Sequence, residues 1–140
     1  MSAPPIAEAS DPRDWQLAIR VLAMPADTNA YGDIFGGWLM SQVDIAGSTI
    51  AIHVAQGRVA TVAVNQMQFV APVLVGDLVN LYARLVRTGR TSITVEIEAW
   101  ALRERDPSNR NKVGVATLTY VAVAADGRPR PIPTSQSSEA

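Results

Sequence analysis

Residues 27–57 read DTNAYGDIFGGWLMSQVDIAGSTIAIHVAQG. The first part is a loop of glycines and short polar side chains. The second part predicts one long helix that begins near Gly36 or Gly37 and stops at Gly57. A helix that is apolar on almost every side is expected to be buried. Its single formal charge is Asp44, and a buried carboxylate is costly unless it is paired or used. We therefore expect the rest of the chain to wrap this helix.

The composition excludes several classes of protein. The 140 residues are 48% hydrophobic and carry a net charge of -1, which fits one domain with no general attraction to nucleic acid or membranes. The absence of cysteine excludes disulfides, a thiolate nucleophile and a cysteine metal site. Residues 1–10 lack the basic start and apolar run of a secretory signal, so we expect a cytoplasmic protein.

Alternating apolar and polar residues predict the remaining elements. Strands are expected over residues 15–23, 58–70, 77–88, 91–103 and 113–123. The turn at Gly89 should join the third and fourth strands as a hairpin. The last strand is apolar on both faces, which is typical of the middle of a sheet.

The predicted fold class is therefore α+β. An antiparallel sheet of about five strands should cover the central helix within residues 13–126. Residues 1–12 and 127–140, rich in proline and small or polar residues, are expected to be a flexible arm and tail. A single sheet layer leaves strand edges uncovered, so self-association is expected.

Few catalytic chemistries remain available. The single histidine, His53, and the absence of a Gly-x-Ser-x-Gly motif argue against a Ser-His-Asp hydrolase. No cluster of histidines and carboxylates has metal-ligand spacing, so we expect no metal. His53 lies in the last turns of the helix, where an imidazole favours the negative end of the helix dipole.

What remains is a helix N-terminus, a carboxylate and an amide. The first-turn N–H groups at Gly36 and Gly37 lack intrahelical acceptors and could stabilise an oxyanion, although a tight turn without a ligand explains the glycines equally well. Asp44 could be a general base or nucleophile, or a structural ion pair. Asn29 could be catalytic or an ordinary turn asparagine.

The spacing of these groups argues for two chains. Asp44 lies roughly 12 Å along the helix from Gly36 at about 1.5 Å per residue, and Asn29 precedes the helix. One chain is therefore not expected to bring Asn29 and Asp44 into one catalytic centre. They could meet if two helices pack side by side. The small residues at positions 46–48 would permit close approach to the sheet or to another helix.

Residues 27–44 closely resemble the signature of the hotdog-fold acyl-CoA thioester hydrolases, the bacterial YciA-like group related to brain acyl-CoA hydrolase. The specific part is the combination Asn-x-x-Gly-x-x-x-Gly-Gly followed by an aspartate, which here begins at Asn29 and includes Asp44. The similarity extends from about Trp15 to Pro133, nearly the whole chain.

This resemblance implies a hotdog sheet around the central helix, a dimer with a continuous sheet, and often a trimer of dimers. It implies hydrolysis of acyl-CoA to free acid and CoA at the dimer interface. Asp44 of one subunit would activate water or attack the thioester directly. Asn29 of the other would orient the water or the thioester. The thioester oxygen would contact the backbone amide of Gly37, with Gly36 shaping the turn.

The resemblance also implies a site for CoA, which is part of the substrate, so no separate cofactor is expected. The CoA phosphates need cations or hydroxyls at the cleft mouth. The candidates are Arg58, Arg84, Arg90, Lys112, Thr91 and Ser92, with Arg90 preferred, although a solvated surface position is the more common role for each such residue.

Two other functions stay open. A non-catalytic acyl-CoA-binding or regulatory hotdog module would keep the same fold. A hotdog hydratase or dehydratase would be expected to use a histidine with a carboxylate, and no histidine lies near the loop.

Overall fold

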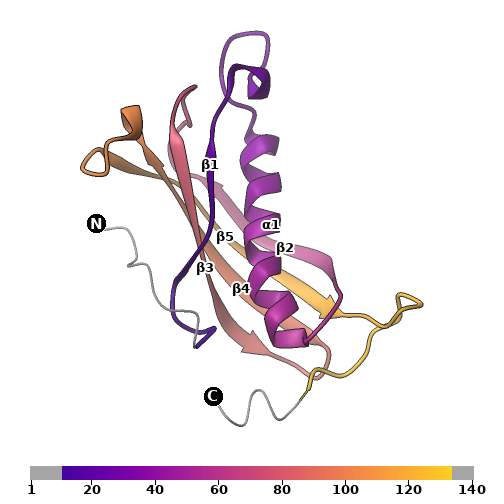
Figure 1. Cartoon of the computed structure of the whole chain (residues 1–140). Coiled ribbons are helices and arrows are strands. Elements are labelled where there is room, and N and C mark those ends of the chain that lie inside the picture. Colours follow the sequence, from indigo (N-terminus) through magenta and orange to yellow (C-terminus); the bar gives the residue numbers. More distant parts are fainter. Residues whose placement is uncertain (1–10, 134–140) are drawn as a thin grey trace.

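The computed structural model describes residues 11–133, which form an antiparallel five-stranded sheet against one long helix, α1 (Gly36–Ala55) (Figure 1). The sheet order is β1-β3-β4-β5-β2. The strands are β1 (Gln16–Leu22), β2 (Val59–Phe69), β3 (Leu78–Thr88), β4 (Ser92–Leu102) and β5 (Arg110–Ala122). Two short 3-10 helices are η1 (Pro25–Asp27) and η2 (Arg103–Arg105). The α+β hotdog prediction is confirmed, including the hairpin at Gly89.

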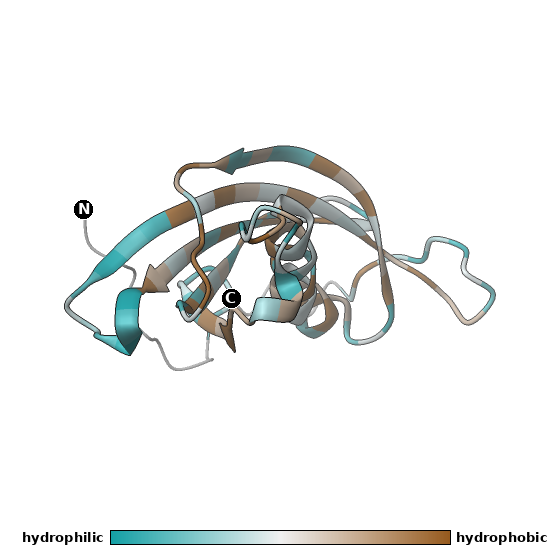
Figure 2. Ribbon diagram, turned by 90° about the horizontal axis from the view of Figure 1, so that it is seen from above, coloured by the Kyte–Doolittle hydropathy of each residue, from teal (hydrophilic) through white to brown (hydrophobic). Residues whose placement is uncertain are grey.

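The sheet curves around α1, which lies across its inner face (Figure 2). The helix buries the side that includes Leu39, Val43 and Ile50. These side chains join a core with alternate residues of the strands, including Ile97 and Leu118. This burial is the main favourable contribution to the fold.

The far side of α1 is not buried within one chain. Ile45 and Ile52 are 53% and 47% exposed. The prediction that the helix is covered on nearly every side is therefore wrong for a single protomer. The sheet has one layer and covers only one side of the helix, and nothing else within residues 11–133 covers the other side.

The C-terminal end of α1 differs from the expected glycine cap. Gln56 adopts the left-handed conformation, with φ 55° and ψ 43°, and its N–H donates to the carbonyl of His53. Gly57 follows, and its N–H donates to the carbonyl of Ile52. Both bonds satisfy carbonyls that the helix end leaves free. Gln56, rather than Gly57, takes the left-handed turn.

Irregular register in the outer strands changes which side chains share a face. In β1 the register shifts between Leu17 and Ile19, so the two residues lie on opposite faces rather than on one. In β2 two shifts put Ala63 opposite Thr119 and Val64 opposite Leu118. The simple alternation predicted for these strands is therefore wrong at these points, since each bulge reverses the faces beyond it.

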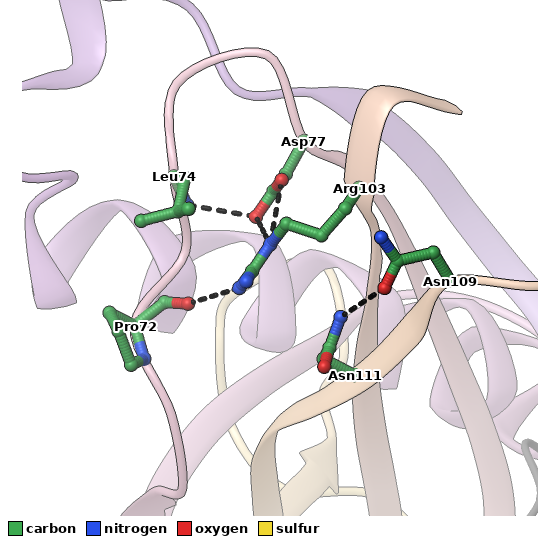
Figure 3. A network of polar contacts seen from close by, with 6 residues as sticks. All are labelled: Pro72, Leu74, Asp77, Arg103, Asn109 and Asn111. Carbon is green, nitrogen blue, oxygen red and sulfur yellow. Dashed lines mark hydrogen bonds and ion pairs between the residues drawn. The ribbon is translucent and has the colours of Figure 1, made fainter. Parts of the chain in front are cut away.

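The loop before β3 is fixed by an ion pair between a buried carboxylate and a partly exposed arginine (Figure 3). Asp77 is 2% exposed and lies 3.0 Å from Nε of Arg103. Its carboxylate also accepts the N–H of Leu74, and Arg103 donates to the carbonyl of Pro72. The network joins the start of β3 to the turn after β4.

The first part of the predicted loose tail packs against the domain. Ile132 is buried and its N–H donates to the carbonyl of Arg90. Arg130 donates from its backbone to Ala122 and from its side chain to the carbonyl of Ala55. These bonds tie residues 130–132 to the ends of β5 and α1. The predictions for residues 1–10 and 134–140 lie outside the described residues.

Within residues 11–133, no helix is both long enough and apolar enough to cross a membrane.

Candidate active site

The side chain of Asp44 points from α1 toward β2, the strand at one edge of the sheet. Its side chain is half-buried. Oδ1 accepts a hydrogen bond from Oγ1 of Thr61 at 2.8 Å. The hydroxyl of Tyr120 lies 3.1 Å from Oδ1 and 2.7 Å from the backbone carbonyl of Asp44. Within the described residues Oδ2 has no hydrogen bond and no cation pairs with this carboxylate, so Oδ2 is free to accept a proton or attack.

Tyr120 is a permanent donor to Asp44. Its side chain is completely buried on β5. Burial, and then the nearby charge of Asp44, raise the pKa of the Tyr120 hydroxyl far above its ordinary value. The phenol therefore keeps its proton and holds Oδ1 and the helix backbone in place.

A glycine in the middle of α1 makes this contact possible. A Cβ built on Gly47 would overlap the hydroxyl oxygen of Tyr120 and would come within 3.2 Å of Cδ1 of Ile97. Alanine stabilises a helix interior relative to glycine, so packing rather than helix propensity explains this residue. The expected close approach at residues 46–48 is thus made to the sheet.

The first turn of α1 offers two free backbone donors. Phe35 is the N-cap residue, and no side chain caps the helix. The first backbone hydrogen bond of the helix runs from the N–H of Trp38 to the carbonyl of Phe35. Within the described chain, the N–H groups of Gly36 and Gly37 therefore have no acceptor. A Cβ on Gly37 would meet open space, whereas one on Gly36 would press on the ring of Phe69. The Gly37 amide is accessible to a ligand and carries the positive end of the helix dipole.

Asn29 builds the loop that precedes this helix. Its Oδ1 accepts the N–H groups of Tyr31 and Asp33 at 2.9 and 3.1 Å, an asparagine-stabilised turn. A short bridge between Thr28 and Ile34 closes the loop, which projects beyond the N-terminal end of α1 (Figure 1). The side-chain oxygen is occupied by the turn, so the amide NH2 is the group left to contact anything else.

Within one protomer, no hydrogen bond among the described residues joins Asn29 to Asp44. Asn29 lies in the projecting loop, whereas Asp44 lies two turns into α1, facing β2 and β5. The protomer brings Asp44, Thr61 and Tyr120 together and leaves Asn29 apart from them.

Four of the six candidates for CoA binding gather at one end of the sheet. Backbone N–H groups of Ala122 and Val123 donate to the carbonyls of Thr91 and Arg58, respectively. Arg90 and Ser92 flank Thr91 at the start of β4. Ala122 is two residues from Tyr120, roughly 7 Å along the strand. This group therefore lies on the same part of β5 as Tyr120, which contacts Asp44.

The other two candidates lie on the outer face of the sheet, which we define as the face away from α1. Arg84 pairs with Glu96 at 2.9 Å and stacks on Trp15. Lys112 lies 3.5 Å from Glu98 and over the ring of Trp100. The structure does not bring Arg84 or Lys112 to the side of Asp44.

Sequence reasoning did not single out Thr61 or Tyr120 as site residues. The signal that could have found them is a hydroxyl on the otherwise apolar, helix-facing side of each of their strands. Both hydroxyls face the only carboxylate of the helix. Among the described residues, no group of three or more histidines or carboxylates could hold a metal ion.

Comparison with known proteins identifies the fold and its relatives. The model of the thioesterase superfamily matches residues 31–108. The acyl-CoA thioester hydrolase YciA of Salmonella typhimurium is 55% identical over 120 residues, covering 84% of this chain and 90% of that protein.

Two solved structures are similar over most of their length. The hexameric thioesterase of Yersinia pestis is 55% identical with a TM-score of 0.78, over 84% of this chain and 95% of that one. The hexameric hotdog fold thioesterase of Campylobacter jejuni is 38% identical with a TM-score of 0.82, over 88% and 94% of the two chains. The chain therefore belongs to the thioesterase superfamily and, within it, to the YciA family of acyl-CoA thioester hydrolases.

Proposed function

We propose that this acyl-CoA thioester hydrolase cleaves acyl-CoA to free acid and CoA at sites shared between two copies of the chain. Each site takes Asp44 from one copy and Asn29 from the other. The observation that carries this proposal is the position of Asp44 beside an edge strand that one chain leaves uncovered. A single protomer thus has its carboxylate in place and its asparagine elsewhere.

The surface beside Asp44 suits a second copy of the chain. β2 ends the sheet, and Val62 and Val64 on it are 58% and 48% exposed. On α1, Ile45 and Ile52 are also exposed. Unpaired strand edges and contiguous exposed apolar side chains are features of protein interfaces. Pairing of β2 with β2 of another copy would continue the sheet, and three such dimers would give the hexamer that related thioesterases form.

The proposed reaction uses the two oxygens of Asp44 differently. Thr61 and Tyr120 hold Oδ1, which leaves Oδ2 to take a proton from the attacking water or to attack the thioester carbon itself. In the first route the C–S bond breaks as water adds and CoA leaves as a thiol that takes up the proton held by Asp44. In the second route CoA leaves first, and water then hydrolyses the acyl group on Asp44. The thioester oxygen would lie against the amide of Gly37, where the helix dipole stabilises the developing negative charge. Gly36 keeps the turn tight against Phe69.

Asn29 would act through its amide NH2, because its oxygen is held by the turn. In the proposed dimer the projecting loop of one copy reaches the Asp44 side of the other. The NH2 group would then donate to the attacking water or to the thioester. The two hydrogen bonds to Oδ1 thus fix the direction in which the NH2 group of Asn29 points.

The CoA phosphates are proposed to bind at the sheet end that holds Arg58, Arg90, Thr91 and Ser92. Arg90 in the β3–β4 turn is the preferred single contact. No cofactor is required beyond the CoA of the substrate. The proposed compartment is the cytoplasm, since a chain without cysteine suits a reducing compartment.

Subunit complementation tests the shared site. Asn29→Ala and Asp44→Ala proteins are each expected to be almost inactive in a thiol-release assay with acyl-CoAs of graded chain length. After the two are mixed under conditions that exchange subunits, activity should return to roughly a quarter of the parent rate. Half of randomly formed dimers are mixed, and one of two sites in each is intact. No recovery despite proven exchange would contradict the proposal.

A second variant separates the catalytic and structural roles of Asn29. Asn29→Asp keeps an oxygen for the N–H groups of Tyr31 and Asp33 but removes the NH2 donor. It should preserve the thermal stability of the protein and lose most of its activity. Parent-level activity in Asn29→Asp would mean that the NH2 group has no part in the reaction.

A further inference from the structure

A cavity lies on the outer face of the sheet, on the opposite side from Asp44. Its volume is about 210 Å³. The lining side chains come from β1, β3, β4, the turn after β4 and the start of β5: Arg20, Leu78, Asn80, Tyr82, Trp100, Leu102, Arg105, Pro107 and Arg110. Register supports the arrangement, because Arg20 lies opposite Asn80 and Asn80 opposite Trp100. The sheet separates this cavity from the candidate active site.

Every charged group in the lining is an arginine. Arg20 is held by one bond, from Nε to Oδ1 of Asn80 at 2.7 Å, which leaves its terminal NH2 groups to face the cavity. Within residues 11–133, Arg105 and Arg110 make no side-chain hydrogen bond or ion pair. Three guanidinium groups around one cavity repel one another unless an anion joins them.

Nearby acidic groups are engaged elsewhere or lie outside the lining. Glu98 accepts from Nε1 of Trp100 at 3.0 Å and pairs with Lys112. Asp106 accepts both the N–H and the hydroxyl of Ser108. Glu104 precedes Arg105 in the turn and does not line the cavity. The lining itself therefore carries three positive charges and no negative one.

The turn that carries Arg105 is held in an unusual backbone conformation. Glu104 and Arg105 are consecutive non-glycine residues with φ values of 54° and 57°. This region is unfavourable for residues with a side chain, and such strain is concentrated at functional sites. The conformation places Arg105 in the cavity wall.

We propose that this outer cavity binds the phosphate group of a small phosphorylated molecule. Arginine forks match the oxygens of phosphate in geometry, and three positive charges suit a dianion better than a monocarboxylate. The apolar and aromatic floor of Leu78, Leu102 and Trp100 takes the adjoining part of the ligand. A volume of about 210 Å³ is below that of a pocket for a whole drug-sized ligand, so it fits a head group. The ligand is CoA itself or another phosphate ester.

The test is a titration of the full-length protein with inorganic phosphate, followed by ³¹P line broadening and by tryptophan fluorescence at constant ionic strength. The parent should bind saturably. Arg105→Gln/Arg110→Gln should bind at least about tenfold more weakly, because charge-assisted bonds are lost. Arg87→Gln/Arg128→Gln, which removes the same charge outside the cavity, should bind like the parent.

Further arms identify the source of the phosphate. Adenosine 3′,5′-bisphosphate competing with inorganic phosphate on the Asp44→Ala protein points to CoA, and competition by glucose 6-phosphate alone points to another ester. Absence of saturable binding, equal weakening in both double variants, or preference for butyrate would each overturn the proposal. The site does not depend on the shared-site mechanism, since every readout is binding without turnover and the competition uses a protein that lacks Asp44.

Discussion

Strands β4 and β2 have the same length of 11 residues and similar apolar content, yet they occupy opposite environments. β4 lies in the middle of the sheet and buries most of its side chains on both faces. β2 ends the sheet and exposes most of its side chains, Val62 and Val64 among them. The β4 residues find their partners within the chain, whereas β2 leaves one edge unpaired and most of its side chains exposed among the described residues. Asp44 and Thr61 lie at the incomplete side.

Two carboxylates near these strands, Asp77 and Asp44, also differ in their surroundings. Asp77, at the end of the sheet where β4 ends, is buried and paired with Arg103. Asp44, beside β2, accepts hydroxyl donors on Oδ1 and keeps Oδ2 free. A permanently paired carboxylate stabilises a fold, and one with a free oxygen is available for chemistry. The predictions below test this contrast from the largest expected effect to the smallest.

Asp44→Asn should lower kcat by about 10³-fold, because the amide keeps the size of the side chain but has no free basic oxygen. The melting temperature should stay close to that of the parent, since no ion pair is broken. Thiol release and thermal unfolding measure the two effects. A variant that unfolds early and retains its rate per folded molecule would reverse the assignment.

Asp77→Asn should show the opposite pattern. Loss of the buried charge leaves Arg103 without its partner and should lower the free energy of unfolding by about 3 kcal/mol. The rate per folded molecule should change little. Urea unfolding followed by circular dichroism gives the stability, with Arg128→Gln, at an exposed ion pair, as the control that changes little. If the urea midpoint of Asp77→Asn equals that of the parent, Asp77 does not stabilise the fold and the contrast with Asp44 is wrong.

Gly47→Ala should lower both stability and kcat, because the added methyl group pushes the Tyr120 hydroxyl away from Asp44. The expected destabilisation is about 2 kcal/mol, typical of overpacking. Adding Tyr120→Phe should restore part of the stability but not the rate, since room returns without the hydroxyl. A double-variant cycle on unfolding and kcat measures the coupling. Additive effects would show that the two residues act separately.

Val62→Lys should weaken assembly at least about tenfold, because a charge at the proposed contact must be desolvated. Val86→Lys, at a residue that is similarly exposed on β3, is the matched control. Light scattering after size-exclusion chromatography gives the mass of each variant, and the thiol-release assay gives the loss of activity. Equal masses for both variants across a dilution series would mean that β2 is not the contact.

The sequence predicts the elements well because their periodicity is strong. The helix start near Gly36, the hairpin at Gly89 and the interior position of β5 all follow from patterns of adjacent residues. The shifts between Leu17 and Ile19 and within β2 do not, since a bulge is chosen by the pairing of distant strands rather than by the local alternation.

The candidate site divides in the same way. Asp44 stands out from the sequence as the one carboxylate in an apolar helix, and the glycines at the helix start indicate free amides. Tyr120 could not be assigned to Asp44 from the sequence, because the contact joins residues 76 apart and depends on how α1 crosses the sheet. The tight packing of Ile132 was missed since a short proline-rich tail has no periodic signal.

Gly47 has a practical consequence for engineering this enzyme. Replacing glycine by alanine inside helices is a common route to heat-resistant variants, since each such change can add up to about 1 kcal/mol. Here the missing methyl group is the space that the tyrosine hydroxyl occupies. Directed evolution toward higher thermal tolerance must therefore leave this position unchanged, and a library that varies it would enrich for damaged catalysts or for second-site losses at the tyrosine.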